Sequence, residues 1–320
     1  RFSDSTYKEF KKWLDNLQTQ GATKLVLDLR DNPGGFLHIA KQIADEFLED
    51  DKLIVFTKNK KGKIENYFAT KKGDFQNGEI YVLINENSAS ASEIIAGALQ
   101  DNDKGTILGR RSFGKGLVQR DMALGDGSAV RLTVSRYYTP TGRSIQRSYE
   151  NGNEDYYHEY YKRIDNGELS EAKNIEVADS LKFTTPNGKV VYGGGGIIPD
   201  VFVPIDKKME NGTINRIIGS GMMSYFVFED LDKDRTPYQN MSQEDFVTNY
   251  IVTDNDLERF TEYINRRTRY KITFVAYREE VKLYIKATLA EQLYGTQAHM
   301  QVLNTNDAML KKVRELVNNN

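Results

Sequence analysis

An apolar segment, a serine-rich turn and a segment of small residues follow one another in residues 80–101, IYVLINENSASASEIIAGALQD. The run Ile80–Ile84 predicts a buried strand, and residues 91–100 predict a helix whose small side chains allow close packing. The polar residues 85–90 between them predict a tight turn. A strand that leads through a turn into a helix is the repeating unit of an α/β fold.

The same alternation extends to both sides of this segment. Upstream, an apolar strand is followed by residues 31–35 (DNPGG), which are a strong loop signal, and then by a segment with helical spacing. Strands that alternate with helices favour an α/β core with a largely parallel sheet. The predicted elements are helices over 4–20 and 37–49 and strands over 25–29, 53–57 and 106–108.

The pattern changes after Gly109. Residues 117–124 and 129–138 flank a Gly-Asp-Gly-Ser turn, which indicates a long β-hairpin. Residues 149–182 are rich in tyrosine and charge and poor in aliphatic residues, so we expect an insertion over the surface. Strand and turn signals return over 190–203.

A second region begins at about Asp206, where the chain becomes helical in pattern. Ser242 and Thr253 are each followed three residues later by an acid, a variant of the capping box that marks a helix start. We therefore expect a core domain over 1–205 and a mostly helical region over 206–320. Its clearest predicted helices span 274–294 and 308–317.

Composition excludes several classes of function. Lysine and arginine total 44 and aspartate and glutamate 46, a balance that argues against a dedicated nucleic-acid binder. No apolar run approaches the length of a transmembrane helix. Cysteine is absent, which excludes thiol nucleophiles and thiolate metal sites. The three histidines, His38, His158 and His299, are too few to suggest a His-rich metal centre. Because the sequence starts with Arg1, we expect it to be part of a longer protein.

Three serines around the start of the predicted helix over 91–100 are candidate nucleophiles: Ser88, Ser90 and Ser92. A serine at a helix N-terminus lies beside free backbone N–H groups and in a field that favours negative charge. This setting suits a nucleophile with an oxyanion hole. The alternative is plain helix capping, which serine performs well. Spacing alone does not choose between the two roles or among the three serines.

Lys115 is the candidate general base, because it lies between Gly114 and Gly116 and strand residues follow it. Glycines let the backbone approach closely, and burial of the lysine would favour the neutral amine that can accept a proton from serine. Gln119 lies four residues on, which places it on the same face of a regular strand. The ordinary alternative is a solvated lysine. The histidines are rival bases, but no sequence context places one beside a serine.

Two glycine-rich segments are candidate anion-binding sites. Residues 109–116 (GRRSFGKG) fit G-x-x-x-x-G-K, but Gly116 stands where Ser or Thr would bind Mg²⁺, and a strand rather than a helix is predicted to follow. A phosphate loop is therefore disfavoured. The four glycines 193–196 could cradle an anion, but they also allow a tight chain reversal or close packing, which we favour.

Five segments, taken in order, resemble the C-terminal processing peptidases, which are also called tail-specific proteases. The segments are LVLDLRDNPGG (25–35), SASASEIIAGALQD (88–101), GRRSFGKGLVQ (109–119), TVSRYYTPTGRSIQ (133–146) and GIIPDV (196–201). The resemblance covers about residues 1–205, and it implies a βα-layered, crotonase-like α/β core with the long hairpin and the helical region after it.

The resemblance also implies roles for individual residues. Ser90, the middle serine of SASAS, would be the nucleophile, and Lys115 the general base. Gln119 would help to hold the lysine. The other implied residues are Ala91 and Gly35, whose N–H groups would form the oxyanion hole, and Asp101, with a supporting structural role.

The implied activity is that of a serine endopeptidase that cleaves proteins near exposed C-terminal tails through an acyl-enzyme, with no metal or cofactor. The implied location is the bacterial periplasm or cell envelope, and a PDZ domain is expected upstream of this chain. No nucleic-acid partner is expected. Two other classes remain open: a degenerate relative that binds peptides or apolar ligands, and an assembly element whose helices over 242–317 form a homo-oligomer interface.

Overall fold

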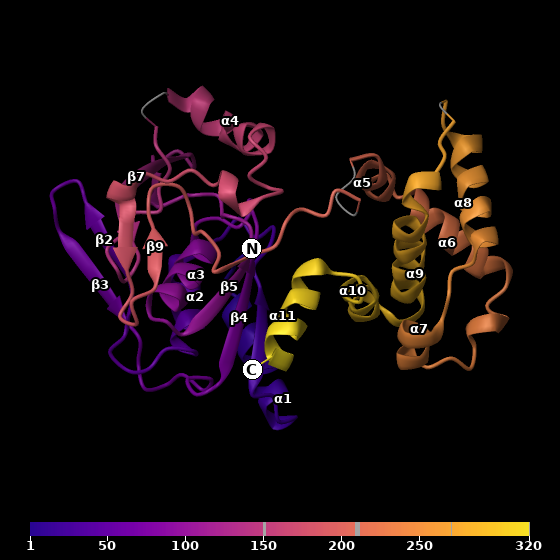
Figure 1. Cartoon of the computed structure of the whole chain (residues 1–320), viewed down its shortest axis with the longest axis horizontal. Coiled ribbons are helices and arrows are strands. Elements are labelled where there is room, and N and C mark those ends of the chain that lie inside the picture. The colour runs from indigo at the N-terminus through magenta and orange to yellow at the C-terminus, as the bar shows by residue number, and fades with distance from the viewer. Residues whose placement is uncertain (150–151, 209–211, 270, 320) are drawn as a thin grey trace. The chain divides into compact units, whose positions relative to one another are not determined.

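The computed structural model of the chain describes residues 1–149, 152–208, 212–269 and 271–319 (Figure 1). The chain divides into two compact units, Arg1–Pro204 and Ile205–Asn320. Each unit has an apolar core of its own.

A four-stranded parallel sheet lies at the centre of the first unit. Residues Ile80–Ile84 are buried throughout, as expected for a central strand that is covered on both faces. The helix that follows, α3 (Ala91–Asp101), is buried along its whole length, because its small residues let neighbouring elements approach. The strand order is β1 (Lys24–Asp28), β4 (Glu79–Ile84), β5 (Gly105–Gly109) and β10 (Val201–Phe202), with α1 (Thr6–Thr19) and α2 (Leu37–Asp45) in the same unit.

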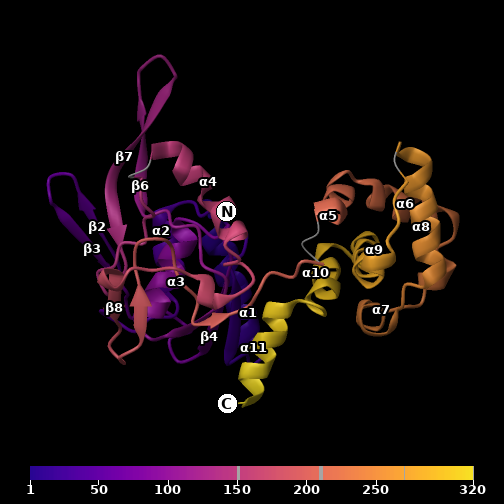
Figure 2. The same ribbon diagram turned by 45° about the horizontal axis from the view of Figure 1, so that its top comes forward.

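A second, antiparallel sheet also contacts α3, so this helix lies against strands of both sheets. The α/β class and the parallel sheet are confirmed, and the structure adds a second, antiparallel sheet that includes the predicted hairpin. Sequence reasoning omits β3 because its side chains are mostly exposed and show no regular alternation of apolar and polar residues. Figure 2 shows the predicted hairpin of β6 and β7 extending away from the unit. The strand order is β3 (Ile64–Phe68), β2 (Leu53–Asn59), β7 (Ala129–Tyr138) and β6 (Leu117–Ala123).

The predicted surface insertion contains a helix that is partly buried. This helix, α4 (Gly152–Asp165), buries Tyr156 and Arg163 against the core and exposes other aromatic side chains. Sequence pattern did not indicate the burial, because an arginine on a charged helix predicts a solvated face. The elements after α4 are η1 (Ala172–Asn174), η2 (Asp179–Leu181), β8 (Lys182–Thr184) and β9 (Val190–Tyr192).

The second unit is helical, as predicted. Ser242 and Thr253 cap two of its helices by accepting hydrogen bonds from the N–H groups of Asp245 (3.1 Å) and Asp256 (3.3 Å). Within the described ranges, no helix combines the length and apolarity needed to cross a membrane. The elements are α5 (Gly212–Gly219), α6 (Met222–Lys233), η3 (Thr236–Tyr238), α7 (Gln243–Asn249), α8 (Asp254–Arg267), η4 (Val275–Tyr277), α9 (Arg278–Tyr294), α10 (Thr296–Asn304) and α11 (Ala308–Asn319).

Candidate active site

Ser90 occupies a strained turn between β4 and α3. Its φ of 57° and ψ of −113° are values that residues with a side chain rarely adopt. Such strain typically costs about 1–3 kcal/mol and persists only where the surrounding structure imposes it. The turn places Ser90 directly before the first residue of α3, where backbone N–H groups have no partner inside the helix.

The structure separates the three candidate serines by what their hydroxyl groups do. Ser88 is buried and donates to the carbonyl of Leu29 (2.8 Å), and Ser92 donates to the carbonyl of Asn32 (2.9 Å). Both hydroxyls therefore hold the loop that follows β1. No described residue accepts a hydrogen bond from the hydroxyl of Ser90, which lines a cleft. Of the three, Ser90 alone is placed to react with a bound molecule.

The loop after β1 brings a second backbone N–H group to this turn. A Cβ atom on Gly34, whose φ is +90°, would lie 2.7 Å from Ala91 N and 2.8 Å from Ser90 Cβ, so only glycine allows this approach. The N–H of Gly34 donates to Asn32 Oδ1 (3.0 Å). Those of Gly35 and Ala91 have no acceptor among the described residues, and both residues line the same cleft as Ser90.

Lys115 lies in an irregular segment, residues 110–116, that leads from β5 into β6 and is called the lysine segment below. Its side chain lines the cleft with Ser90 and forms no ion pair within the parts of the chain that the structure covers. The segment needs its glycines, because a Cβ on Gly114 (φ +89°) would lie 3.1 Å from backbone atoms of Gly195 and Gly196. The predicted strand follows directly, so the phosphate-loop reading of this segment is not supported.

Glu93 links the turn that carries Ser90 to the lysine segment. Sequence reasoning did not identify Glu93 as a site residue. Its buried carboxylate accepts from Ser112 Oγ (2.5 Å) and Gly114 N (2.7 Å) at Oε1, and from Ser90 N (2.8 Å) and Lys115 N (2.9 Å) at Oε2. Burial raises the pKa of Glu93, although the donors around it oppose this effect. The signal was available: an acid three residues after a candidate N-cap serine is the capping-box pattern.

Tyr137 from β7 also connects the two parts of the site. Its hydroxyl lies within hydrogen-bond distance of the carbonyl oxygens of Ser90 (3.0 Å) and Lys115 (2.5 Å). Burial, reinforced by the charge of Glu93, raises the pKa of Tyr137 well above its usual value, so the hydroxyl keeps its proton as a donor. No local pattern marks this tyrosine, because its partners lie on distant segments.

The remaining expected site residues are divided between the cleft and the core. Gln119 lines the cleft, but β6 has a register irregularity between Val118 and Gln119, and no hydrogen bond links Gln119 to Lys115 in the described structure. Asp101 does not line the cleft. It is buried and accepts hydrogen bonds from Thr141 Oγ1 (2.7 Å) and Arg143 Nη2 (2.7 Å), which makes it part of a buried ion pair. None of the histidines lines the cleft.

The cleft has a volume of about 740 Å³ and is lined by both apolar and polar side chains. Charged side chains lie toward the hairpin, where Asp121 and Arg131 form an exposed ion pair (2.7 Å). Among the described residues, no group of His, Asp and Glu side chains is arranged to hold a metal ion. The apolar wall is formed by Phe2, Phe36, Leu37, Ile94, Leu117 and Val118.

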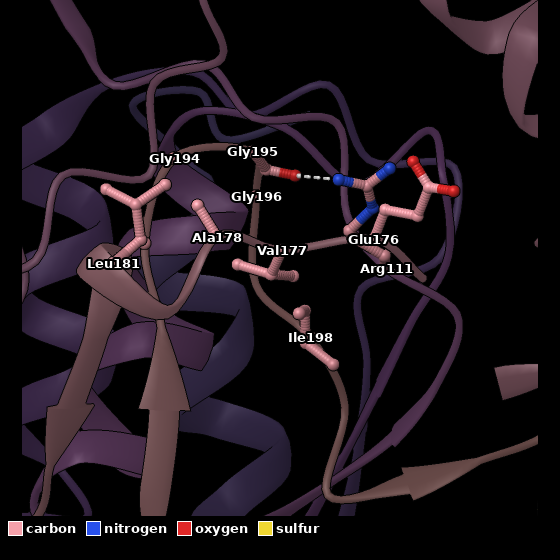
Figure 3. Close-up of a pocket in the computed structure, with 10 residues that line it drawn as sticks. Arg111, Glu176, Val177, Ala178, Leu181, Gly194, Gly195, Gly196 and Ile198 are labelled. Carbon is pink, nitrogen blue, oxygen red and sulfur yellow. Dashed lines mark hydrogen bonds between the residues drawn. The ribbon is translucent and has the colours of Figure 1, made fainter. Parts of the chain in front are cut away.

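The four glycines 193–196 are not placed as an anion cradle. Figure 3 shows the small pocket beside them, of about 90 Å³, where Arg111 Nη1 donates to the carbonyl of Gly195 (3.4 Å). A Cβ on Gly196 would lie 2.5 Å from the carbonyl oxygen of Ser112. The guanidinium of Arg111 is engaged by the buried carboxylate of Glu168 (2.7 and 2.5 Å). The glycines therefore serve close packing of the lysine segment.

The first unit is similar in sequence to known peptidases. Residues 1–152 match the model of peptidase family S41, and residues 213–295 match a family of unknown function (DUF8443). The chain is 46% identical over 151 residues to the carboxy-terminal-processing protease of Bartonella bacilliformis, covering 46% of this chain and 35% of that protein. It is 44% identical over 147 residues to the carboxyl-terminal-processing protease of a Picosynechococcus species, again covering 46% and 35%.

The chain thus spans about a third of the length of the curated relatives that it matches. A solved structure, the photosystem II D1 C-terminal processing protease, is 30% identical and superposes with a TM-score of 0.45 over 63% of this chain and 40% of that chain. The sequence relationship lies in the first unit, where all of the candidate site residues are found. On that relationship, residues 1–152 of this chain belong to peptidase family S41.

Proposed function

We propose that this chain is the core of a serine endopeptidase that cleaves proteins near their C-terminal tails, with Ser90 as nucleophile and Lys115 as general base. One observation carries the proposal. Ser90 is held in a strained turn, beside the free N–H groups of Ala91 and Gly35, in a cleft that Lys115 also lines. A nucleophile, a base and oxyanion donors around one cleft are the parts that acyl transfer requires.

The proposed reaction proceeds in two steps. The neutral amine of Lys115 takes the proton of Ser90 Oγ as this oxygen attacks the substrate carbonyl, and Ala91 N–H and Gly35 N–H bind the oxyanion. The intermediate collapses when the C–N bond breaks and the ammonium of Lys115 returns its proton to the leaving amine. Lys115 then activates a water molecule, which attacks the acyl-enzyme, and the same oxyanion donors bind the second intermediate. The acid product leaves and Ser90 regains its proton.

The preference for C-terminal tails rests on the relatives, whose names describe carboxyl-terminal processing. We also propose that the substrate is locally unfolded, so that an extended segment can enter the cleft, whose lining includes Phe36, Leu117 and Val118. The bacterial periplasm or cell envelope is the location we propose, again by analogy with the family.

The test is digestion of an unfolded protein by the full-length enzyme, beside variants of each proposed group. Ser90→Ala and Lys115→Ala should each abolish cleavage, and Lys115→Arg should do the same because guanidinium keeps its proton. Ser88→Ala is the matched control: it loses a buried structural hydroxyl but should still cleave. Activity that survives Lys115→Ala would assign the base to another group, and loss with Ser88→Ala alone would assign the nucleophile to Ser88.

The second candidate function is that of a relative that binds peptides without catalysis. The parent protein and its Ser90→Ala variant also distinguish this function from proteolysis. A fluorophosphonate reagent labels a serine only if that serine is activated. Labelling of the parent enzyme that disappears in Ser90→Ala supports catalysis. A parent that binds peptides but is never labelled would support the binding module instead.

A further inference from the structure

The helix α4 packs against the segment that carries Lys115. Its inner face presents Tyr156 and Arg163, which are 5% and 2% exposed, whereas Tyr157 and Tyr161 on the outer face are 68% and 61% exposed. A buried arginine is uncommon and needs partners for each of its donors. The partners of Arg163 define what the helix does.

Arg163 donates hydrogen bonds to backbone carbonyls of the lysine segment. Nη1 lies 2.8 Å from Ser112 O and 3.3 Å from Arg111 O, and Nη2 lies 3.3 Å from Gly195 O. Glu159, one turn earlier on α4, forms an ion pair with the same guanidinium (3.0 Å) and so holds it in place. Bonds of this kind from a charged donor are stronger than those between neutral groups.

A second contact holds the segment from another side. The guanidinium of Arg147 lies over the rings of both Phe113 and Tyr156, at 3.8 and 4.0 Å from their centroids. Its Nη1 also pairs with Glu159 (2.9 Å), and its backbone N–H donates to Gly114 O (3.1 Å). Phe113 and Gly114, which directly precede Lys115, are therefore tied to α4 through one arginine.

Ser112 links these contacts to the site. Its carbonyl accepts from Arg163, and its hydroxyl donates to Glu93 Oε1 (2.5 Å). Glu93 in turn accepts from the backbone N–H groups of Ser90 and Lys115. A chain of hydrogen bonds through Ser112 and Glu93 thus connects α4 to the backbone of the proposed nucleophile and base.

We propose that α4 positions the general base, and that Arg163 is the positioning residue. The segment 110–116 has no regular secondary structure, so its conformation depends on the partners that its backbone groups find. Arg163 supplies donors to two of its carbonyls and Glu93 supplies acceptors to two of its N–H groups. The proposal rests on the proposed function in one respect, that Lys115 is the base.

The test combines hydrogen exchange with kinetics on the full-length protein. In Arg163→Met, which keeps the volume but removes the donors, amide exchange in residues 112–116 should rise about 10-fold while exchange in β4 stays unchanged. The kcat should fall about 10- to 100-fold with little change in KM, because the base is displaced while the cleft walls remain. The labelling rate of Ser90 by a fluorophosphonate should fall in parallel.

Two further variants separate positioning from general stability. Tyr157→Ser, on the outer face of the same helix, should leave exchange and kcat as in the parent. Arg163→Lys, which keeps the charge beside Glu159 but has fewer donors, should fall between the parent and Arg163→Met. If Arg163→Met does not fold, a localised rise in exchange in Arg163→Lys decides for the proposal.

Unchanged exchange in residues 112–116, or a rise spread evenly over the first unit, would overturn the proposal. The exchange measurement needs no substrate, so it judges α4 even if the protein cleaves nothing. Failure of the proposed function would be seen separately, as full activity of Ser90→Ala and Lys115→Ala or as a parent that is never labelled.

Discussion

Glu93→Gln replaces one oxygen of a buried carboxylate by an amino group, and the four donors around it determine the effect. Oε2 receives two backbone N–H groups, from Ser90 and Lys115, which cannot turn away. Oε1 receives the N–H of Gly114 and the hydroxyl of Ser112, and a hydroxyl can rotate to become an acceptor. The amide should therefore place its nitrogen at the Oε1 position.

In that orientation a single backbone N–H, that of Gly114, loses its acceptor. One buried unsatisfied donor costs about 1–3 kcal/mol, so Glu93→Gln should destabilise the first unit by that amount. The opposite orientation would leave two donors unsatisfied and cost about 2–6 kcal/mol. Glu93→Ala leaves all four donors without an acceptor, which costs on the order of 4–12 kcal/mol and approaches the whole stability of a typical domain. We expect that the alanine variant does not fold.

Urea unfolding followed by tryptophan fluorescence measures this directly. Trp13 is the single tryptophan of the chain and lies on α1, so its signal reports the first unit without the second. A Glu93→Gln protein within about 0.5 kcal/mol of the parent would refute the reasoning, since buried donors would then have found other partners. A stable, folded Glu93→Ala protein would refute it more strongly. Since the Ser90 and Lys115 contacts survive in the glutamine variant, its activity should fall but persist.

Three further predictions follow from the same geometry. Ser90→Gly should be more stable than Ser90→Ala by about 1 kcal/mol in the same urea titration, because glycine adopts a φ of 57° without strain, and equal stabilities would mean that the turn is unstrained. Gly34→Ala should abolish fluorophosphonate labelling, since its Cβ would lie 2.6 to 2.8 Å from three neighbouring atoms; normal labelling would show that the loop can move aside. Burial alone would raise the pKa of Glu159, but the guanidinium groups of Arg163, Arg147 and Arg111 outweigh burial and lower it. The stability that Glu159 contributes is therefore present above its unfolded pKa and lost as the pH falls through the lowered one. Protection of the amides in 112–116, measured against their intrinsic exchange rate at each pH, should therefore fall in acid, but not in Glu159→Gln.

Local sequence was sufficient for the elements that depend on neighbours along the chain. The run Ile80–Ile84, the small residues of α3 and the turn between β6 and β7 each carry a period or a turn signal within a few residues. The caps at Ser242 and Thr253 are equally local. The ordered motifs around Ser90 and Lys115 also marked the family, because each motif is a short, contiguous string.

The division of the strands between two sheets was beyond local reasoning. A strand pattern shows which residues alternate, but not which strand will pair beside it or in which direction. The pairing of β2 with β7 joins segments about 80 residues apart, and β3 shows little apolar alternation at all. Its place is decided by the neighbour that it finds.

The amino-acid sequence by itself determined the alternation of strands and helices, the hairpin, the helical second region and the short list of candidate groups. Only the tertiary structure decided that the hydroxyls of Ser88 and Ser92 are committed to Leu29 and Asn32 while that of Ser90 faces the cleft. The tertiary structure alone showed that Glu93 accepts hydrogen bonds from both Ser90 and Lys115 and that α4 is hydrogen-bonded to the lysine segment. The physical reason is that periodicity and capping are interactions between near neighbours, whereas hydrogen-bond partners that lie 20 to 60 residues apart exist only after the chain has folded.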